Sequence, residues 1–490
     1  MPVGNIASSI YRLGNRKFVS LSLFNNRILL TLIVFRVIIS VIGLVLLIGL
    51  ITDLWFRLKK PAKPTGGITF MRQFSPLLNL EKIHGIPNIG KVQDPDLSCL
   101  NAIRTLSLLW VELGHLYYFL GISIDNLIPV GRLQERFTFQ FVFGGAFAVD
   151  SFFFLSGFLA YWSMAKRMSA NTFKFWKSLP MIYLHRYLRI TLPHVGLMLL
   201  ATGLWAHIGD GPFYFQGTDA YCKSNWWINL LYLNNFIDIS HQCVGWNWYL
   251  MVDMQFFIFA PFVVYLLVRK PNLGWLLAFF GLVVQVVTAS VISAVYAIPL
   301  GGKPGNYEEN LEATGYEEKN FENQYEYYYA KPYTRVGPYV IGLMFAHILV
   351  ANRKAVDSFV RNRLLSFISW FLSFGIILAL IYGTYDLYVG NALEPLWADV
   401  LYNALARSFW ALALGWIVIT CSTGKGGIIG DALGWKGWAI PARLSYSAYL
   451  LHPMVDLYFG QTRSVPFVFP IFFNFIHCIS LAVAHSMSPI

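Results

Sequence analysis

Residues 101–115 read NAIRTLSLLWVELGH, an apolar, helix-like stretch that carries Arg104, Glu112 and His115. On an ideal helix, the eleven residues from Arg104 to His115 make three full turns plus about 20°, so the two side chains share one stripe. They lie roughly 16 Å apart along the helix axis. Glu112 lies three residues before His115 on nearly the same face, where it can hold or tune the imidazole. Ionisable side chains in so apolar a stretch indicate a chemical site built within a membrane.

The composition supports a membrane location. Hydrophobic residues make up 56% of the sequence and charged residues only 13%, whereas charged residues form about 25% of an average soluble domain. Runs of roughly 17 to 25 apolar residues, the length that crosses a bilayer, occur at residues 28–52, 104–120, 144–164, 191–208, 248–268, 273–298, 336–350, 364–383, 400–421, 444–459 and 466–485. We therefore predict an all-α fold, a polytopic membrane helix bundle with about 10–11 transmembrane helices.

Lys and Arg in the loops predict the orientation of these spans, because short loops rich in these residues stay on the cytosolic side. Residues 165–190 contain several Lys and Arg residues and no acid, so we expect them to be cytosolic. Acids concentrate in the opposite loops, 299–335 and 384–399. The net charge of +12 thus reflects anchors at the inner face and does not indicate a nucleic-acid partner.

The first span stands apart in the sequence from those that follow. We predict that residues 1–99 form an N-terminal region with one membrane anchor span and a cytosolic connector, and that residues 100–490 form the main membrane domain. We expect an integral, multi-pass protein of the endoplasmic reticulum or the plasma membrane, in contact with membrane lipids.

Two of the five cysteines, Cys222 and Cys243, flank a loop that the charge pattern places on the lumenal or extracellular side. A disulfide between them would close a loop of about 22 residues and stabilise the fold by roughly 3 kcal/mol. Two free thiols are the alternative. The sequence has no CxxC pair and no phosphate-cradling glycine loop, and we expect no metal.

Further ionisable residues lie in or beside the predicted spans. Trp246, Tyr249 and Asp253 share one helical stripe, an aromatic wall that ends in a carboxylate just below the outer surface. This pattern is typical of a mouth for an acceptor substrate. Asp150 and His452 are predicted to lie inside spans, where a structural partnership or a place in a packed core is the alternative to a direct role.

Basic residues mark the ends of other spans. Arg186 and Arg189 lie three residues apart in LHRYLRITLP, which we place at the inner surface, and guanidinium groups there can bind phosphates. Plain anchoring at the inner face is the other interpretation of this pair. Arg335 is predicted to lie at the outer end of its span.

The chain resembles the acyltransferase 3 family, in the animal branch called nose-resistant-to-fluoxetine-like. The motifs shared with the family are the Arg104 and His115 pair with ten residues between, FFFLSGFL at 152–159, RYLRITLP at 186–193 and YLLHP at 449–453. The motifs similar to the animal branch are CKSNWWINLLYLNNF from Cys222, WNWYLMVDMQFF from Trp246 and KPYTRVGPYVIG from Lys331. The resemblance makes residues 100–490 an acyltransferase 3 membrane domain, and the short segment before the first span resembles the short-form members, which lack the large N-terminal extracellular domain.

The resemblance implies transfer of an acyl group, commonly acetyl, from acyl-CoA as donor substrate to a hydroxyl of a carbohydrate or lipid. The residues implied for the donor phosphates are Arg104, Arg186 and Arg189. His115 would then act as general base, with Asp150 or Glu112 orienting its ring. The residues implied for the acceptor are Trp246, Tyr249, Asp253, Arg335 and His452.

Two questions stay open at this stage. Transfer can be direct or can pass through an acyl-enzyme at Ser156 or His115. A bundle lined by carboxylates and histidines can also carry a lipid, a drug or protons without making a covalent bond, or can serve as a non-catalytic signalling protein.

Overall fold

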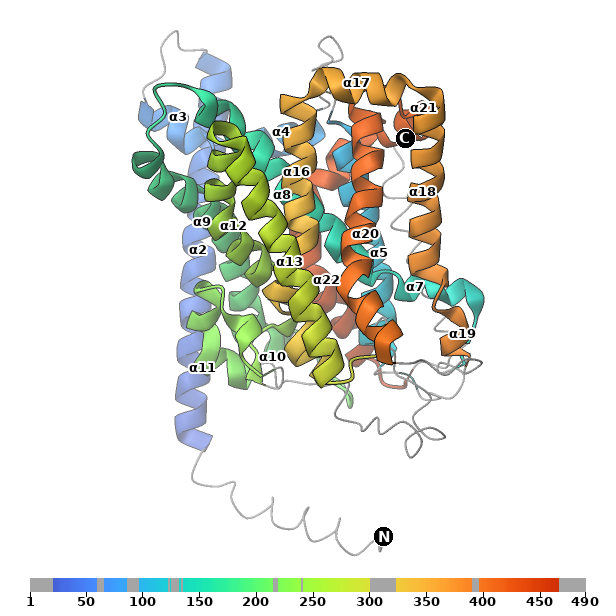
Figure 1. The fold of residues 1–490 in the computed structure, drawn as a ribbon. Helices are drawn as coiled ribbons and strands as arrows, with labels where there is room; N and C mark the ends of the chain where they lie inside the picture. Colours follow the sequence, from blue (N-terminus) through green and yellow to red (C-terminus); the bar gives the residue numbers. More distant parts are fainter. Residues whose placement is uncertain are drawn as a thin grey trace, which may run out of the picture. The chain divides into compact units, whose positions relative to one another are not determined.

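The computed structural model describes residues 21–59, 66–85, 97–121, 124, 132–133, 135–214, 219–238, 241–299, 323–389 and 396–466. The described chain is built from helices (Figure 1), which confirms the predicted all-α class. Within it, seven helices are long and apolar enough to cross a membrane. An eighth span is added if α16 and α17, which are bent by 94° at their junction, count as one.

The longer helices are α2 (Leu21–Lys59), α5 (Cys99–Gly121), α8 (Ala146–Ser169), α9 (Phe175–Leu199), α11 (Asp219–Leu230), α12 (Trp248–Arg269), α13 (Pro271–Val295), α16 (Val336–Ala351), α18 (Arg363–Tyr382), α20 (Leu396–Ser422) and α22 (Ala439–Gln461). The shorter ones are α3 (Gly66–Arg72), α4 (Pro76–His84), α7 (Gln140–Phe143), α10 (Trp205–Ile208), α17 (Arg353–Arg361), α19 (Tyr385–Tyr388) and α21 (Gly427–Leu433). Short 3-10 turns are η2 (Phe137–Phe139), η4 (Asn234–Phe236), η6 (Gly245–Asn247), η9 (Pro332–Thr334) and η10 (Lys436–Trp438), and π-helical turns are η3 (Leu200–Leu204) and η8 (Gln324–Tyr329).

The predicted spans differ from the observed ones in two respects. Helix α9 starts at Phe175, although we predicted a cytosolic loop up to residue 190, so Arg186 and Arg189 lie within a helix and not at its entrance. Helices α5 and α22 coincide with predicted spans and have 23 residues each, but they are not among the seven apolar ones. The predicted span 466–485 lies almost wholly outside the described residues, and the total of 10–11 spans stays a prediction.

The chain divides into two compact units, Met1–Gly85 with Leu199–Ile208, and Ile86–Met198 with Gly209–Ile490. In the first unit α3 and α4 pack on the end of α2. Asp53 is fully buried there and accepts hydrogen bonds from Arg57 Nε at 2.9 Å and Arg72 Nε at 2.5 Å. Arg57 also donates two hydrogen bonds to Glu81, at 2.8 and 2.7 Å, so the unit is closed by ion pairs as well as by apolar contact.

Helix α8 forms the centre of the second unit, and α16 packs on it most closely. A Cβ at Gly157 of α8 would collide with the backbone carbonyl of Tyr339, and a Cβ at Gly342 of α16 would collide with the backbone of Phe154. Each helix therefore presents a glycine to the backbone of the other, the small-residue packing that membrane helices use to approach closely.

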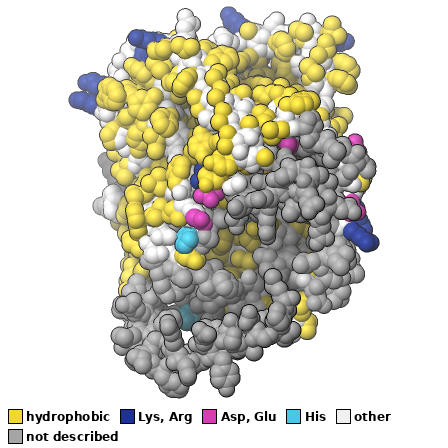
Figure 2. Space-filling model, turned by 60° about the horizontal axis from the view of Figure 1, so that its bottom comes forward, with side chains coloured by type: hydrophobic (Ala, Val, Ile, Leu, Met, Phe, Trp, Pro, Cys, Tyr) yellow, Lys and Arg dark blue, Asp and Glu magenta, His cyan; other side chains and the backbone are white. Residues whose placement is uncertain are grey.

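Basic side chains gather on helix connections at one end of the second unit. Helices α17 and α21 lie at one end of the bundle and α19 at the other (Figure 1), and the first end carries Arg353, Lys354, Arg361 and Lys425. On the face drawn in Figure 2 the described surface is mainly hydrophobic, with Lys and Arg side chains at its margins. Large apolar side chains such as Phe280 of α13 and Phe371 of α18 are exposed, as expected for helices that face lipid.

Candidate active site

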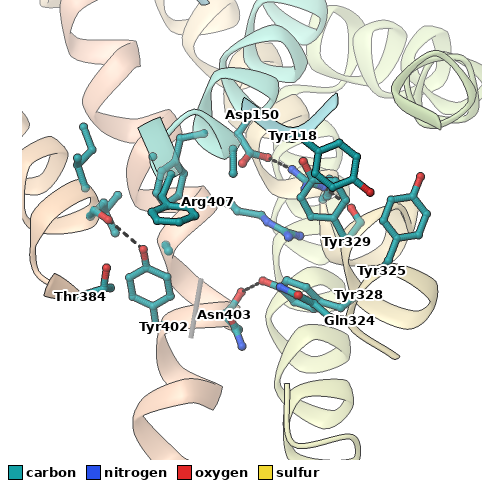
Figure 3. Close-up of a pocket in the computed structure, with 18 of the residues that line it drawn as sticks. Tyr118, Asp150, Gln324, Tyr325, Tyr328, Tyr329, Thr384, Tyr402, Asn403 and Arg407 are labelled. Atoms are coloured by element: carbon teal, nitrogen blue, oxygen red, sulfur yellow. Dashed lines mark hydrogen bonds and ion pairs between the residues drawn. The ribbon is translucent and has the colours of Figure 1, made fainter. Parts of the chain in front are cut away.

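The second unit contains a cavity of about 450 Å³ with walls from α5, α7, α8, α18, α20 and residues 324–335. Four predicted site residues line it: His115, Asp150, Trp246 and Arg335. Seven others do not: Arg104, Glu112, Arg186, Arg189, Tyr249, Asp253 and His452. Figure 3 shows the polar part of the wall, where tyrosines and an arginine project into the space between the helices.

His115 meets a second histidine across the contact between α5 and α22. Its Nδ1 lies 2.7 Å from Nε2 of His452, with the ring planes 16° apart and the ring centres 5.0 Å apart. Nδ1 of His452 lies 3.2 Å from the carbonyl oxygen of Ala448. A carbonyl only accepts, so His452 carries its proton on Nδ1, and its Nε2 accepts from Nδ1 of His115. Nε2 of His115, on a side chain that lines the cavity, is thereby left as a free base.

The carboxylates that we expected to orient His115 have other surroundings. Glu112 lies on α5 as predicted, but the electrostatic neighbour that the structure gives it is Asp456 of α22. Asp150 is buried in an ion pair with Arg335, Oδ1 to NH1 at 3.0 Å. The hydrogen-bond partner that fixes the ring of His115 is therefore the neutral imidazole of His452, since neither carboxylate is hydrogen-bonded to that ring within the described residues.

Arg335 is the more enclosed half of the Asp150 pair, with a side chain that is 1% exposed. Its Nε donates to the carbonyl of Tyr329 at 2.6 Å, and its guanidinium carbon lies 4.8 Å from the ring centre of Trp248 and 4.5 Å from that of Tyr329. Paired charges and aromatic faces together make burial of this cation tolerable. The pair fixes the segment before α16 against α8.

Tyrosines of η8 complete one side of the cavity. Tyr328 donates to the carbonyl of Asn403 at 2.7 Å, and burial raises its pKa, so it stays a neutral donor. Burial also raises the pKa of Tyr325. Next to them Lys331 donates to the carbonyl of Asn235 at 2.6 Å, and burial lowers its pKa. These side chains hold the segment 324–335 in place without adding a negative charge to the cavity.

A second polar cluster lies among α8, α9 and α12. Arg186 of α9 forms an ion pair with Asp253 of α12, and Asp253 Oδ1 accepts from Ser156 Oγ at 2.5 Å. NH2 of Arg186 also donates to Ser156 Oγ at 3.2 Å, and its guanidinium lies 4.1 Å from the Phe257 ring. Arg186 and Asp253 neutralise each other within the bundle, so our placement of the first at the inner surface and of the second at an outer mouth cannot hold for both.

The remaining predicted residues near this cluster are Arg104, Arg189 and Tyr249. Arg104 of α5 is partly buried, and Arg189 of α9 is exposed. Arg104 interacts electrostatically with both Arg189 and the Tyr249 hydroxyl. Neither arginine forms an ion pair with a carboxylate of the described part of the chain, and two arginines that repel each other in this way are suited to an anionic ligand.

Residues 97–487 match the family model described as an acyltransferase domain, of the acyltransferase 3 type. The chain belongs to the acyltransferase 3 family. Nose resistant to fluoxetine protein 6 of Caenorhabditis elegans is 33% identical over 407 residues, which cover 79% of this chain and 48% of that protein. Regulator of hypoxia-inducible factor 1 of the same species is 25% identical over 427 residues, which cover 79% of this chain and 77% of that protein. The chain thus spans about half the length of the first relative. No solved structure matches it.

The family resemblance predicted from the motifs is therefore confirmed, and the acyltransferase domain covers both polar clusters. Within the described residues, no group of three or more His, Cys, Asp or Glu side chains is arranged to hold a metal ion. The polar groups that the described residues bring together in these clusters are imidazole, guanidinium, carboxyl and hydroxyl groups.

A disulfide joins Cys222 of α11 to Cys243, as we expected from the sequence. The carbonyl of Cys243 accepts from Asn229 at 3.2 Å and from Asn234 at 3.0 Å. The next residue, Val244, has a φ of 57°, a left-handed conformation that is strained for a β-branched side chain. The disulfide and the asparagines thus fix the turn that presents Trp246 to the cavity.

Several residues of the site were missed in the sequence. Buried Asn247 contacts Nε2 of His194 at 3.0 Å and donates to Asn229 at 2.8 Å. In the sequence, the only indication of this network is the presence of amide side chains within apolar motifs. Arg407 lines the cavity from α20. Its signal was clear, a single arginine inside a predicted span.

Proposed function

We propose that this protein is a membrane-embedded O-acyltransferase that moves an acyl group, most simply acetyl, from cytosolic acyl-CoA to a hydroxyl of a lipid or carbohydrate acceptor. The observation that carries the proposal is the His115–His452 pair beside the cavity. It leaves one imidazole nitrogen of His115 unprotonated on a side chain that lines a space large enough for part of an acceptor.

In the proposed reaction Nε2 of His115 takes the proton from the acceptor hydroxyl. The hydroxyl oxygen attacks the thioester carbonyl, the carbon–sulfur bond breaks, and the imidazolium returns the proton to the leaving thiolate of coenzyme A. General base catalysis of this kind contributes about 10² to 10⁴ in rate. His452 is a positioning residue, because it acts only through the tautomer and orientation of His115.

The donor phosphates fit Arg104 and Arg189, two guanidinium groups whose mutual repulsion an anion would relieve. Arg186 takes no part in donor binding here, since Asp253 already neutralises it. Arg104 and His115 lie on one face of α5, roughly 16 Å apart along the axis, a separation that the extended pantetheine arm can bridge.

The decisive experiment measures thiol release from acetyl-CoA and longer donors by protein in nanodiscs. We expect turnover in the wild type, a loss of about 10² to 10⁴ in His115→Ala, and a raised KM for the donor in Arg104→Ala. His207→Ala, which changes an exposed histidine of α10, is the matched control. If the folded protein neither binds nor turns over the donor but transports a lipid or a drug, the protein is a carrier and the proposed enzymatic function is refuted.

A further inference from the structure

Arg407 is a buried cation in the cavity wall for which the described residues supply no carboxylate. Its side chain projects from α20 into the space between the helices (Figure 3), and the residue is 7% exposed. The structure gives it one hydrogen bond, from NH1 to the carbonyl of Thr334 at 2.8 Å, and the face of the Tyr328 ring at 4.2 Å. Asp150, the one acid among the described lining residues, already forms an ion pair with Arg335.

The described wall therefore holds one positive charge more than it holds negative ones. Arg335 repels Arg407 electrostatically, and the attraction of Asp150 is shared between them. A guanidinium buried at this depth without its own counter-ion is unfavourable. An anion in the cavity would relieve both the burial of the cation and the repulsion.

The surroundings of Arg407 limit what that anion can be. A guanidinium binds carboxylate and phosphate oxygens through two parallel N–H groups. Polar groups of Asn403 and Tyr402 also line this part of the cavity, whereas Phe147 and Ile381 line it with apolar surface. A ligand that matches the wall has an anionic oxygen group joined to hydrocarbon.

We infer that the cavity selects an amphiphilic acceptor whose own phosphate or carboxylate binds Arg407 and whose hydroxyl then faces His115. The inference rests on the proposed function for the role of acceptor, but binding of the anion does not depend on catalysis. Because both residues line one cavity, a single small molecule can reach both. Arg407 thereby sets the class of substrate, and Asp150 keeps Arg335 from competing for the anion.

The test uses two matched pairs of hydroxyl compounds with the full-length protein in nanodiscs. Lysophosphatidate is paired with monoacylglycerol of the same chain, and ricinoleate with its methyl ester. Binding is read from the shift in Tm and transfer from KM with acetyl-CoA as donor. We expect the anionic member of one pair to raise Tm and to have a KM at least about tenfold below that of its neutral partner. The pair of compounds that shows this difference identifies the anionic group of the ligand as phosphate or carboxylate.

Variants assign the effect to Arg407. Arg407→Gln should abolish the preference for the anion, Arg407→Lys should keep part of it through charge alone, and Arg361→Gln, at an exposed arginine of α17, should behave as the wild type. Equal binding of the anionic and neutral members by the wild type overturns the inference even if Arg407→Gln does not fold. An Arg407-dependent Tm shift without any acyl transfer would support the anion site and refute the proposed function. Equal acyl transfer to the anionic and the neutral member would support the proposed function and refute the anion site.

Discussion

The chemistry of a single histidine here depends on which of its nitrogens carries the proton. Nδ1 of His115 donates to His452, and His452 in turn donates to the carbonyl of Ala448, so the chain of donors ends at a group that can only accept. This arrangement fixes the tautomer with a neutral partner where many enzymes use a carboxylate. In the proposed reaction, this neutral partner adds no negative charge beside the acceptor hydroxyl, which becomes more negative as it loses its proton.

The first prediction concerns His452. In His452→Gln the amide oxygen can still accept from Nδ1 of His115, so we expect kcat to stay within about tenfold of the wild type. In His452→Leu that acceptor is gone, and we expect kcat to fall by about 10² while the donor KM stays unchanged. Steady-state kinetics of the two variants decides this. Equal losses in both would mean that His452 only fills space.

The second prediction concerns the Asp150–Arg335 pair. Asp150→Asn leaves Arg335 without its counter-ion at a site that is 1% exposed, and losing one partner of a buried pair costs about 3–5 kcal/mol. We therefore expect a large fall in Tm and in the yield of monodisperse protein in detergent. Asp431→Asn, at an exposed acid of α21, is the control. An unchanged Tm would show that the pair contributes little to folding.

The sequence singled out ionisable residues within the predicted spans, but it did not predict which partners they would meet. His115 and His452 were both selected, but they are 337 positions apart and nothing local couples them. Asp150 was assigned to His115, and its partner is Arg335, 185 positions away. Helical spacing places residues on one face of a single helix, whereas the choice of a partner depends on packing between helices.

At the scale of helices, hydropathy located most elements but misplaced one end. The start of α9 was missed because Lys and Arg were taken as loop residues, although Arg186 is neutralised by Asp253 within the bundle. Charge marks a helix end only while that charge faces water or lipid headgroups. When a charge is buried in an ion pair, it no longer marks a helix end, and the residues near it in the sequence do not reveal the pairing.

The third prediction concerns the contact between α8 and α16. Gly342→Ala would place a methyl group against the backbone of Phe154 and Phe158, which cannot move aside as a side chain can. Overpacking of this kind costs about 1–3 kcal/mol or more, so we expect a clear drop in Tm. Gly375→Ala in α18, where a Cβ meets nothing within 4 Å, should leave Tm unchanged or slightly raised. Equal effects of the two changes would contradict the packing argument.

For the whole molecule, the distribution of charge predicts which end of the bundle faces the cytosol. The basic connections around α17 and α21 lie at one end (Figure 1). The long acidic segment 299–335 and the disulfide loop were both assigned to the opposite side from the sequence. Sidedness follows from composition because it depends on sums over loops and not on the position of any one side chain.

The fourth prediction tests this orientation with glycosylation. Glu312→Thr creates the sequon Asn310-Leu311-Thr in the acidic segment, and Lys354→Thr creates Asn352-Arg353-Thr beside α17. We expect the first variant to gain a glycosidase-sensitive mass in mammalian cells and the second to remain unmodified. Glycosylation of the second variant alone would show that the orientation is the opposite of the predicted one.

The paired glycines of α8 and α16 also limit how the protein can move. Sliding one helix past the other would drive a side chain into the backbone that each glycine now meets, so the two move as one rigid body together with Asp150. The cavity can open only where its wall is held less firmly. Helix α18 supplies Leu380 and Ile381 to that wall, yet it buries only Ser373 and Ile381 of its 20 residues. An opening on that side would lead sideways into the bilayer, so the amphiphilic acceptor that we infer would enter without leaving the lipid phase.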